Sequence, residues 1–122
     1  MKIYKKLRSG LIYYLSMRHL KINGRLKNNA VYLTFDDGPE PDITEFVLDE
    51  LAKYRAKATF FCIGRNVERH PDIYKEILRR GHSVGNHSYS HVKNWTIKKE
   101  DYVSDIYLAE DLIDSNLYRP PY

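Results

Sequence analysis

The sequence predicts an α/β fold with parallel strands, and three observations lead to this class. Two short apolar runs rich in β-forming residues occur at 30–35 and 58–63. A segment with helical spacing of its apolar residues follows each run, at 42–54 and at 71–81. Strands that alternate with helices in this way pair in parallel through crossover helices. We therefore expect functional residues at the carboxyl ends of the strands, where ligands gather in such folds.

The first strand and its helix are each predicted by a local pattern. The run AVYLTF (30–35) is almost continuously apolar, which is typical of a strand buried on both faces. Asp42 is expected to begin the helix, because its carboxylate can cap the first turn and Glu45 stands three residues later, as in a capping box. The apolar residues that recur at helical spacing are Ile43, Phe46, Val47, Leu51 and Tyr54.

The rest of the chain continues the alternation. The run ATFFCI (58–63) predicts a second buried strand, and the helix 71–81 begins with Pro and ends with Gly. Residues 82–86 predict a third strand, 97–115 an acidic helix, and 117–122 a fourth strand near its end. The apolar residues expected to face inward on the two helices are Ile73, Ile77, Leu78, Tyr102, Ile106, Ala109 and Ile113.

Charge divides the chain into two regions. Residues 1–28 form a basic leader with eight Lys or Arg and no acid, whereas residues 29–122 hold 12 basic and 16 acidic side chains. Because the basic character belongs to the leader, we expect no nucleic-acid partner for the domain. The leader resembles a weak secretory signal but lacks a small-residue cleavage site. Its apolar patch is too short to span a membrane, so contact with a membrane surface and a plain packing helix both stay open.

Composition limits the class of protein. A chain of 122 residues with 43% hydrophobic and 30% charged residues is typical of one soluble globular domain. The single cysteine, Cys62, excludes a disulfide framework within the chain and, inside an apolar run, predicts a buried and inert thiol. The absence of disulfides does not decide the compartment.

Two adjacent acids, Asp36 and Asp37, follow the first predicted strand directly. Neighbouring residues of a regular strand point to opposite faces, so both carboxylates could not serve one site. Gly38 and Pro39 turn the chain here, which would let both side chains face the same pocket. Two desolvated carboxylates repel each other unless a cation neutralises one of them. A solvated turn is the alternative, and a metal ion is the natural partner if the acids share a site.

The segment HSYSH supplies two histidines, His87 and His91, after the third predicted strand. On a helical turn, residues four apart lie on one face, which suits two imidazoles on one ion. Two histidines and one carboxylate, with positions left for water, form a set used by catalytic Zn²⁺ and by Fe²⁺. An exposed loop is the alternative for His91, and His19, His70 and His82 are expected to be structural.

Three linked motifs carry a resemblance to a known family. TFDDGP (34–39), HSYSH (87–91) and RPPY (119–122) stand in the order found in the polysaccharide deacetylase family, the NodB-homology domain. The wider similarity, which includes ATFFCIG and GHSVGNHSYSH, covers roughly residues 29–122. It implies an irregular (β/α) barrel, of which this chain would hold about the first four strands. It also implies metal-dependent removal of N- or O-acetyl groups from polymers such as peptidoglycan, chitin oligomers, xylan or exopolysaccharide.

The resemblance implies one divalent ion, bound by Asp37, His87 and His91. We expect Zn²⁺. Co²⁺, Ni²⁺ and Mn²⁺ stay open as alternatives, because the metal that a site binds depends on its geometry and on which metals are available.

The resemblance also assigns three catalytic roles. Asp36 would be the general base that activates water, and Arg119 would orient and tune Asp36. The backbone N–H of Tyr122 would help to hold the oxyanion. Amide hydrolysis needs these functions, because the carbonyl resists attack by ordinary water.

The sequence departs from the family pattern because it stops at Tyr122. The pattern continues with further strands and a late Leu-x-His motif, whose histidine protonates the leaving amine. A complete barrel has eight strands, and half of one leaves an open sheet edge. We therefore expect a truncated chain, or a half-domain that needs a partner.

Three functions stay open for such a chain. They are a carbohydrate deacetylase of which it is the N-terminal part, a small-molecule amidase of the same superfamily, and a metal- or sugar-binding remnant without turnover. The substrate class suggests the cell envelope, with its cell wall, or the extracellular space, and the cytoplasm stays open.

Overall fold

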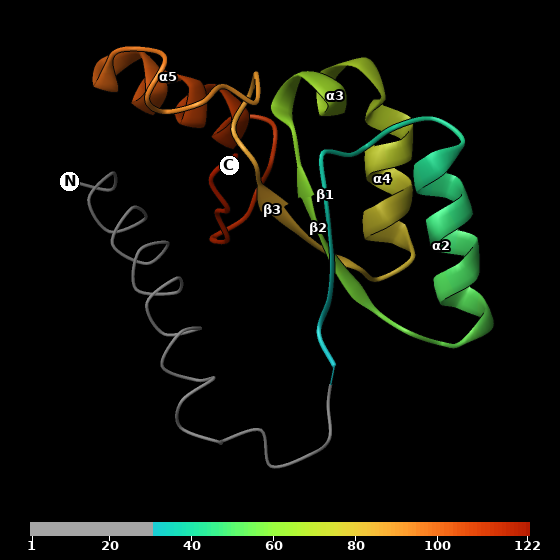
Figure 1. Cartoon of the computed structure of the whole chain (residues 1–122). Helices are drawn as coiled ribbons and strands as arrows, with labels where there is room; N and C mark the ends of the chain where they lie inside the picture. The colour runs from blue at the N-terminus through green and yellow to red at the C-terminus, as the bar shows by residue number, and fades with distance from the viewer. Residues whose placement is uncertain (1–30) are drawn as a thin grey trace.

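The computed structural model describes residues 31–122, which form a three-stranded parallel sheet flanked by helices (Figure 1). The strand order is β1-β2-β3, and both pairs are parallel. The elements in chain order are β1 (Leu33–Asp36), α2 (Ile43–Lys53), β2 (Ala58–Cys62), α3 (Gly64–Arg69), α4 (Pro71–Arg79), β3 (Ser83–Asn86) and α5 (Lys99–Glu110). The predicted α/β class is confirmed. The basic leader, with its predicted signal-like or membrane-surface character, lies outside the described residues.

The crossover helices stand beside the sheet, as parallel strands require. Helix α2 connects β1 to β2, while α3 and α4 together connect β2 to β3. In Figure 1, α2 and α4 lie together on one side of the strands, and they contact each other. Helix α5 packs against β3 and α3. Among the described residues, no helix is long and apolar enough to cross a membrane.

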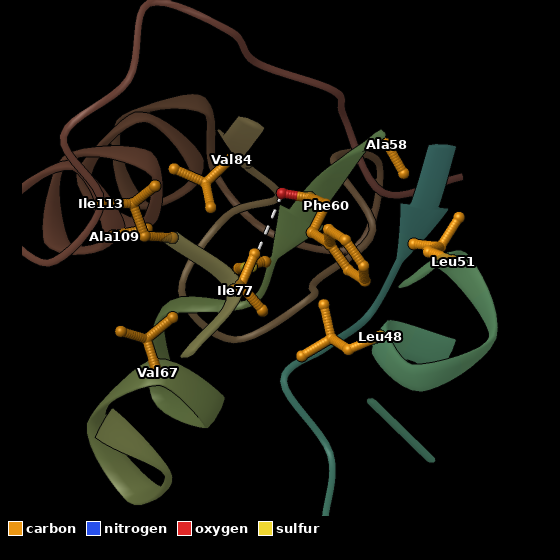
Figure 2. Packing of buried hydrophobic residues seen from close by; sticks show 10 residues of the cluster. Leu48, Leu51, Ala58, Phe60, Val67, Ile77, Val84, Ala109 and Ile113 are labelled. Carbon is orange, nitrogen blue, oxygen red and sulfur yellow. Dashed lines mark hydrogen bonds between the residues drawn. The ribbon is translucent and has the colours of Figure 1, made fainter. Parts of the chain in front are cut away.

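The hydrophobic core lies between the sheet and these helices (Figure 2). The central strand β2 directs Ala58, Phe60 and Cys62 into it, because alternate residues of a strand share a face. Leu48 of α2 and Ile77 of α4 are fully buried against this face. The other core residues are Leu51, Val67, Val84, Ala109 and Ile113. Burying one such aliphatic side chain contributes about 1.5–3 kcal/mol, so this layer supplies the main stability of the described region.

Strand β1 is less buried than its apolar sequence predicts. Three of its four residues are exposed and Phe35 is half-buried, so the expectation of a strand buried on both faces is wrong for β1. The reason is its place in the sheet, since β1 pairs only with β2 and forms an edge among the described strands. Phe35 still stacks on Phe60, with ring centroids 5.2 Å apart.

Several apolar helix residues expected to face the core are exposed instead. Ile43 and Phe46 are both 64% exposed, and Tyr54 is 80% exposed, while Leu48 takes the fully buried position. On α4, Ile77 is buried as predicted but Leu78 is exposed. An apolar groove opens between β1 and α2, lined by Leu33, Phe35, Phe46, Val47, Glu50, Leu51, Tyr54 and Ala56. Phe46 of α2 and Tyr54, which follows the helix, therefore lie along the open edge of the sheet.

The predicted signals mark the start of α2 and both ends of α4, but not the end of α5. The backbone N–H of Asp42 donates to Glu45 Oε2 at 3.4 Å, which is one half of a capping box. Helix α4 begins at Pro71 and ends before Gly81, whose φ of 75° suits glycine. Helix α5 stops at Glu110, earlier than predicted, but Ile106, Ala109 and Ile113 are buried as expected.

The predicted fourth strand is reduced to one isolated bridge. Tyr118 pairs in parallel with Asn86, the last residue of β3. The N–H of Asn86 donates to the Leu117 carbonyl, and the N–H of Arg119 donates to the Asn86 carbonyl. The segment 117–119 is thus held beside the end of β3, which brings Arg119 to the carboxyl edge of the sheet.

Two buried titratable residues have structural roles, as predicted. Cys62 is fully buried, and burial raises the pKa of its thiol to about 12, so the thiol stays protonated and inert. His82 is buried at the start of β3, where its Nδ1 accepts a hydrogen bond from the Ala58 N–H. Burial, with Lys57 and Arg80 nearby, lowers the pKa of His82, so the ring is neutral.

Candidate active site

The residues predicted to share a site meet at the carboxyl end of the sheet. Asp36 ends β1 and Asp37 follows it, while His87 follows Asn86 at the end of β3. Arg119 follows the bridge that joins the chain to β3. Parallel pairing places the ends of β1 and β3 on either side of β2, so residues far apart in sequence become neighbours.

Asp37, His87 and His91 form a compact group of three ligand atoms. Asp37 Oδ1 lies 3.3 Å from His87 Nε2 and 3.0 Å from His91 Nε2. All three ligand atoms lie within 4.8 Å of one another. His87 is buried and His91 is partly buried, while the Asp37 side chain is 63% exposed. The group is therefore held by protein on the histidine side and open on the carboxylate side.

The hydrogen bonding of His87 argues for a cation in this group. Its Nδ1 lies 2.7 Å from the Arg119 carbonyl oxygen, which can only accept a hydrogen bond, so Nδ1 carries the proton. In the neutral ring, Nε2 then presents a lone pair to Asp37 Oδ1, and two acceptors face each other. Either a proton on Nε2 or a metal ion resolves this contact. A backbone carbonyl that fixes the tautomer is also the usual support for a metal-binding histidine.

The turn after β1 has the bend that the Asp-Asp pair requires. Asp37 has φ 72°, in the left-handed region, so the chain leaves the strand at this residue. Asn66 Nδ2 donates to the Asp37 carbonyl at 2.8 Å, and the Ile63 N–H donates to the Gly38 carbonyl at 2.9 Å. These bonds from the segment after β2 hold the turn, so the Asp37 side chain is aimed at the histidines.

The segment that carries the histidines is a loop, not the helical turn that the spacing suggested. Ser88 and His91 both have positive φ, of 64° and 58°. The Ser88 N–H donates to Asn86 Oδ1, and the His91 N–H donates to Ser88 Oγ. The two imidazoles nevertheless meet, with ring centroids 5.0 Å apart. Strained backbone of this kind persists only where the surroundings determine it, and it clusters at functional sites.

Asp105 of α5 holds this loop in place through hydrogen bonds. Its carboxylate accepts hydrogen bonds from the backbone N–H groups of Tyr89 and Ser90 and from the Ser90 hydroxyl. Asp105 is only 8% exposed, so these three donors replace the hydrogen bonds that its carboxylate would make with water. Asp105 was not among the predicted site residues. Its signal was visible, because it stands three residues after Tyr102 and four before Ala109, on the face expected to point inward.

Asp36 forms a separate pair with Arg119. Arg119 Nη1 donates to Asp36 Oδ1 at 2.6 Å and to Thr34 Oγ1 at 3.1 Å. Thr34 and Asp36 are two residues apart on β1, so their side chains share one face of the sheet. Asp36 therefore has a cation of its own, whereas Asp37 faces the histidines. The two acids were predicted to divide their roles, and their surroundings differ accordingly.

A stack of residues holds the Arg119 guanidinium in place. Its central carbon lies 4.0 Å from the centroid of the Phe61 ring. Phe61 in turn lies over Gly85 of β3, where an added Cβ would stand 2.5 Å from the Phe61 ring carbons. Glycine at this position therefore lets the phenyl ring lie close to the sheet and support Arg119.

Tyr122, the last predicted site residue, lies beside the histidines. Its ring centroid is 5.0 Å from that of His91, and the side chain is 68% exposed. In the segment before Tyr122, the Tyr118 hydroxyl lies 2.7 Å from that of Tyr102. Burial and this hydrogen bond raise the pKa of Tyr118, so it stays protonated. All six predicted site residues thus lie at one end of the sheet.

Comparison with known proteins identifies the family. The family model described as polysaccharide deacetylase matches residues 23–122. This chain belongs to the polysaccharide deacetylase family. The predicted resemblance is therefore confirmed, and the parallel sheet is the beginning of the fold seen in structural relatives of the family.

Individual relatives agree with this assignment. A peptidoglycan-N-acetylglucosamine deacetylase from Bacillus cereus is 38% identical over 106 residues, which are 82% of this chain and 38% of the relative. A chitooligosaccharide deacetylase from Rhizobium leguminosarum is 49% identical over 61 residues, covering 50% of this chain and 28% of the relative. The solved structure of the peptidoglycan deacetylase PdaC from Bacillus subtilis is 37% identical, with a TM-score of 0.73 over 79% of this chain and 50% of that chain. This chain thus spans less than half the length of the two curated relatives.

Proposed function

We propose that this chain carries the water-activating part of a metal-dependent carbohydrate deacetylase, which removes acetyl groups from an N-acetylated polysaccharide such as peptidoglycan. The observation that supports this most is the approach of His87 Nε2 and His91 Nε2 to Asp37 Oδ1, next to the Asp36–Arg119 pair. The substrates named for the relatives, peptidoglycan and chitooligosaccharides, support the class of substrate.

Asp37, His87 and His91 fit a divalent cation, and we propose Zn²⁺. One carboxylate and two imidazole Nε2 atoms are a ligand set that zinc accepts in catalytic sites, where three protein ligands leave a position open. The exposed side of Asp37 provides that opening. When bound, the cation would supply Lewis acidity, which lowers the pKa of a water molecule and polarises the acetyl carbonyl.

Asp36 is the proposed general base. It takes a proton from water as the water oxygen bonds to the acetyl carbon, and the backbone N–H of Tyr122 helps to stabilise the negative oxygen that forms. As the carbon–nitrogen bond breaks, the leaving nitrogen takes up a proton in place of the one that Asp36 removed from water, and the products are acetate and a free amine on the sugar. The hydrogen bond from Arg119 Nη1 holds the Asp36 carboxylate in one orientation.

Acetate release from N-acetylated peptidoglycan and from chitotetraose tests this proposal. We expect release that stops when the protein is treated with a chelator and returns when Zn²⁺ is added. Release that survives chelation would contradict the metal-dependent mechanism. Release from a small acetamide but not from either glycan would instead support the amidase alternative. Binding of metal and sugar without any release would support a non-catalytic module.

A further inference from the structure

An exposed aromatic cluster continues outward from the three proposed metal ligands. Trp95 is 67% exposed and lies on the segment between His91 and α5. Its ring centroid is 6.1 Å from that of Tyr122, which in turn is 5.0 Å from that of His91. The ammonium of Lys93 lies 4.6 Å from the centroid of Tyr122 and 6.0 Å from that of Trp95. We call Trp95, Tyr122 and Lys93 the rim cluster.

The rim cluster stands on a turn that is itself held. The Thr96 N–H donates to the Lys93 carbonyl at 3.0 Å, and the Thr96 hydroxyl donates to the same carbonyl at 2.8 Å. Two hydrogen bonds on one carbonyl close the turn 93–96, so Trp95 at its tip is presented to solvent by an ordered backbone. A large aromatic side chain kept out of the core beside a polar site has the character of a binding surface.

A pyranose ring suits this surface. One face of the sugar carries several C–H groups that can lie on an indole ring, while its hydroxyl groups stay in water. Tryptophan supplies a broad, rigid contact area, and the contact loses little rotamer entropy. The rings of His91, Tyr122 and Trp95 follow one another with centroids 5.0 Å and 6.1 Å apart, so Trp95 lies two ring contacts from a proposed metal ligand. A glycan whose acetamide reaches Asp37 and the two histidines could therefore place a neighbouring sugar on Trp95.

We propose that the rim cluster is a sugar-binding subsite that takes the residue next to the one being deacetylated. This rests on the proposed function, which it deepens. Trp95 stacks on the neighbouring sugar, and the Lys93 ammonium, held near the two aromatic rings, interacts with a carboxylate on that sugar. The subsite thus favours an acidic glycan, such as a peptide-free peptidoglycan strand whose lactyl groups are carboxylates, over a neutral chitin chain.

The chain offers its own reporter, because Trp95 is its only tryptophan. We would titrate the Asp36→Asn variant, in which turnover should be at least about 100-fold slower, with chitotetraose and with a peptide-free peptidoglycan tetrasaccharide. The emission of Trp95 should shift and saturate with both sugars, and the acidic sugar should saturate at lower concentration. Unchanged emission at saturating sugar, with binding confirmed by calorimetry, would overturn the subsite.

Variants measured by calorimetry separate the roles of the two side chains. Trp95→Ala should weaken binding of both sugars about tenfold, and Trp95→Phe should restore most of it. Lys93→Gln should remove only the preference for the acidic sugar. Tyr54→Ala is the matched control, because Tyr54 is also an exposed aromatic, 80% exposed, but lies at the end of α2, before β2 begins. Equal affinity in Trp95→Ala and Tyr54→Ala would overturn the proposal.

Kinetics distinguish failure of this subsite from failure of the proposed function. With an active enzyme, Trp95→Ala should raise KM for the tetrasaccharide more than it lowers kcat, as expected when a binding contact is lost. Normal acetate release with an unchanged KM in Trp95→Ala would overturn the subsite and leave the deacetylase. Sugar binding through Trp95 without acetate release would uphold the subsite and overturn the deacetylase.

Discussion

The helix-covered face of the sheet and its carboxyl end are built differently. Beside the crossover helices, β2 and its neighbours bury aliphatic and aromatic side chains in a close-packed layer. At the carboxyl end, the buried residues Asn86, His87, Ser88 and Asp105 are polar and depend on specific hydrogen bonds. Four of the six non-glycine residues with positive φ in the described region, Asp37, Ser88, His91 and Tyr122, also lie there. The core thus supplies stability that supports a strained and polar site.

The largest expected effect comes from the polar end, where a substitution should change activity but not stability. Asp36→Asn keeps the shape of the side chain but removes the proposed base. We expect acetate release to fall about 10²- to 10⁴-fold, while metal stoichiometry stays unchanged. The Asp36–Arg119 pair is about one third exposed, so the unfolding free energy should change little. Activity near that of the parent protein would refute the assignment of the base.

A substitution in the apolar layer should do the reverse. Ile77→Ala removes a fully buried side chain that packs between α4 and the sheet. The lost burial and the resulting cavity should lower the unfolding free energy by about 2–5 kcal/mol, as measured by urea denaturation. Metal affinity of the folded protein should stay the same. A strong fall in metal affinity would mean that the apolar layer and the proposed metal site are coupled more closely than the structure suggests.

Gly85 contacts Phe61, which is buried and also supports Arg119. Substitution of Gly85 should therefore affect both stability and activity. In Gly85→Ala, the added methyl group would enter the space of Phe61, and overpacking of this kind costs about 1–3 kcal/mol. Displacement of Phe61 should also disturb Arg119 and slow acetate release. Phe61→Leu in the same background makes room for the methyl group and should recover part of the stability. No change in either stability or activity would contradict the supporting stack.

The smallest effect concerns pH and belongs to the amino end of the sheet. The pKa of His82 is lowered in the folded state, so the unfolded chain takes up the proton first as the pH falls. Stability should be fully present above about pH 6.5 and should decline as the pH falls toward the folded pKa. His82→Asn keeps an acceptor for the Ala58 N–H and should flatten this part of the pH profile. An unchanged slope would contradict the role assigned to His82.

Sequence patterns predicted the parts of the fold that depend on local signals. Pro71 and Gly81 marked the limits of α4, and the apolar run 58–63 predicted the central strand. The burial of β1 could not be predicted, because it depends on which strands lie beside it. Spacing also placed Phe46 and Tyr54 on the inner face of α2, whereas Leu48 occupies it. Helical spacing leaves such ambiguity where apolar residues surround the whole helix.

The sequence was enough to predict that six candidate site residues would lie at one end of the sheet, but not to predict Asp105 or the backbone that holds them. The order of strands and motifs was enough to bring Asp37, His87 and His91 together. Their spacing suggested a helical turn, but the segment is a loop. The Ser88 hydroxyl accepts a hydrogen bond from the His91 N–H, and Asp105, 16 residues away in sequence, accepts one from the Tyr89 N–H. The ring chain from His91 to Trp95 depends on the path of two loops, which no local pattern encodes.

The most direct test of the central claim, that three residues bind one divalent ion, is metal stoichiometry after dialysis. We expect about one Zn²⁺ per chain in the parent protein and in His70→Ala, a control histidine at the α3–α4 junction. His87→Ala and Asp37→Asn should lose tight Zn²⁺ binding, and circular dichroism should confirm that each variant is folded. Stoichiometric Zn²⁺ in folded His87→Ala, or none in the parent protein, would contradict the account.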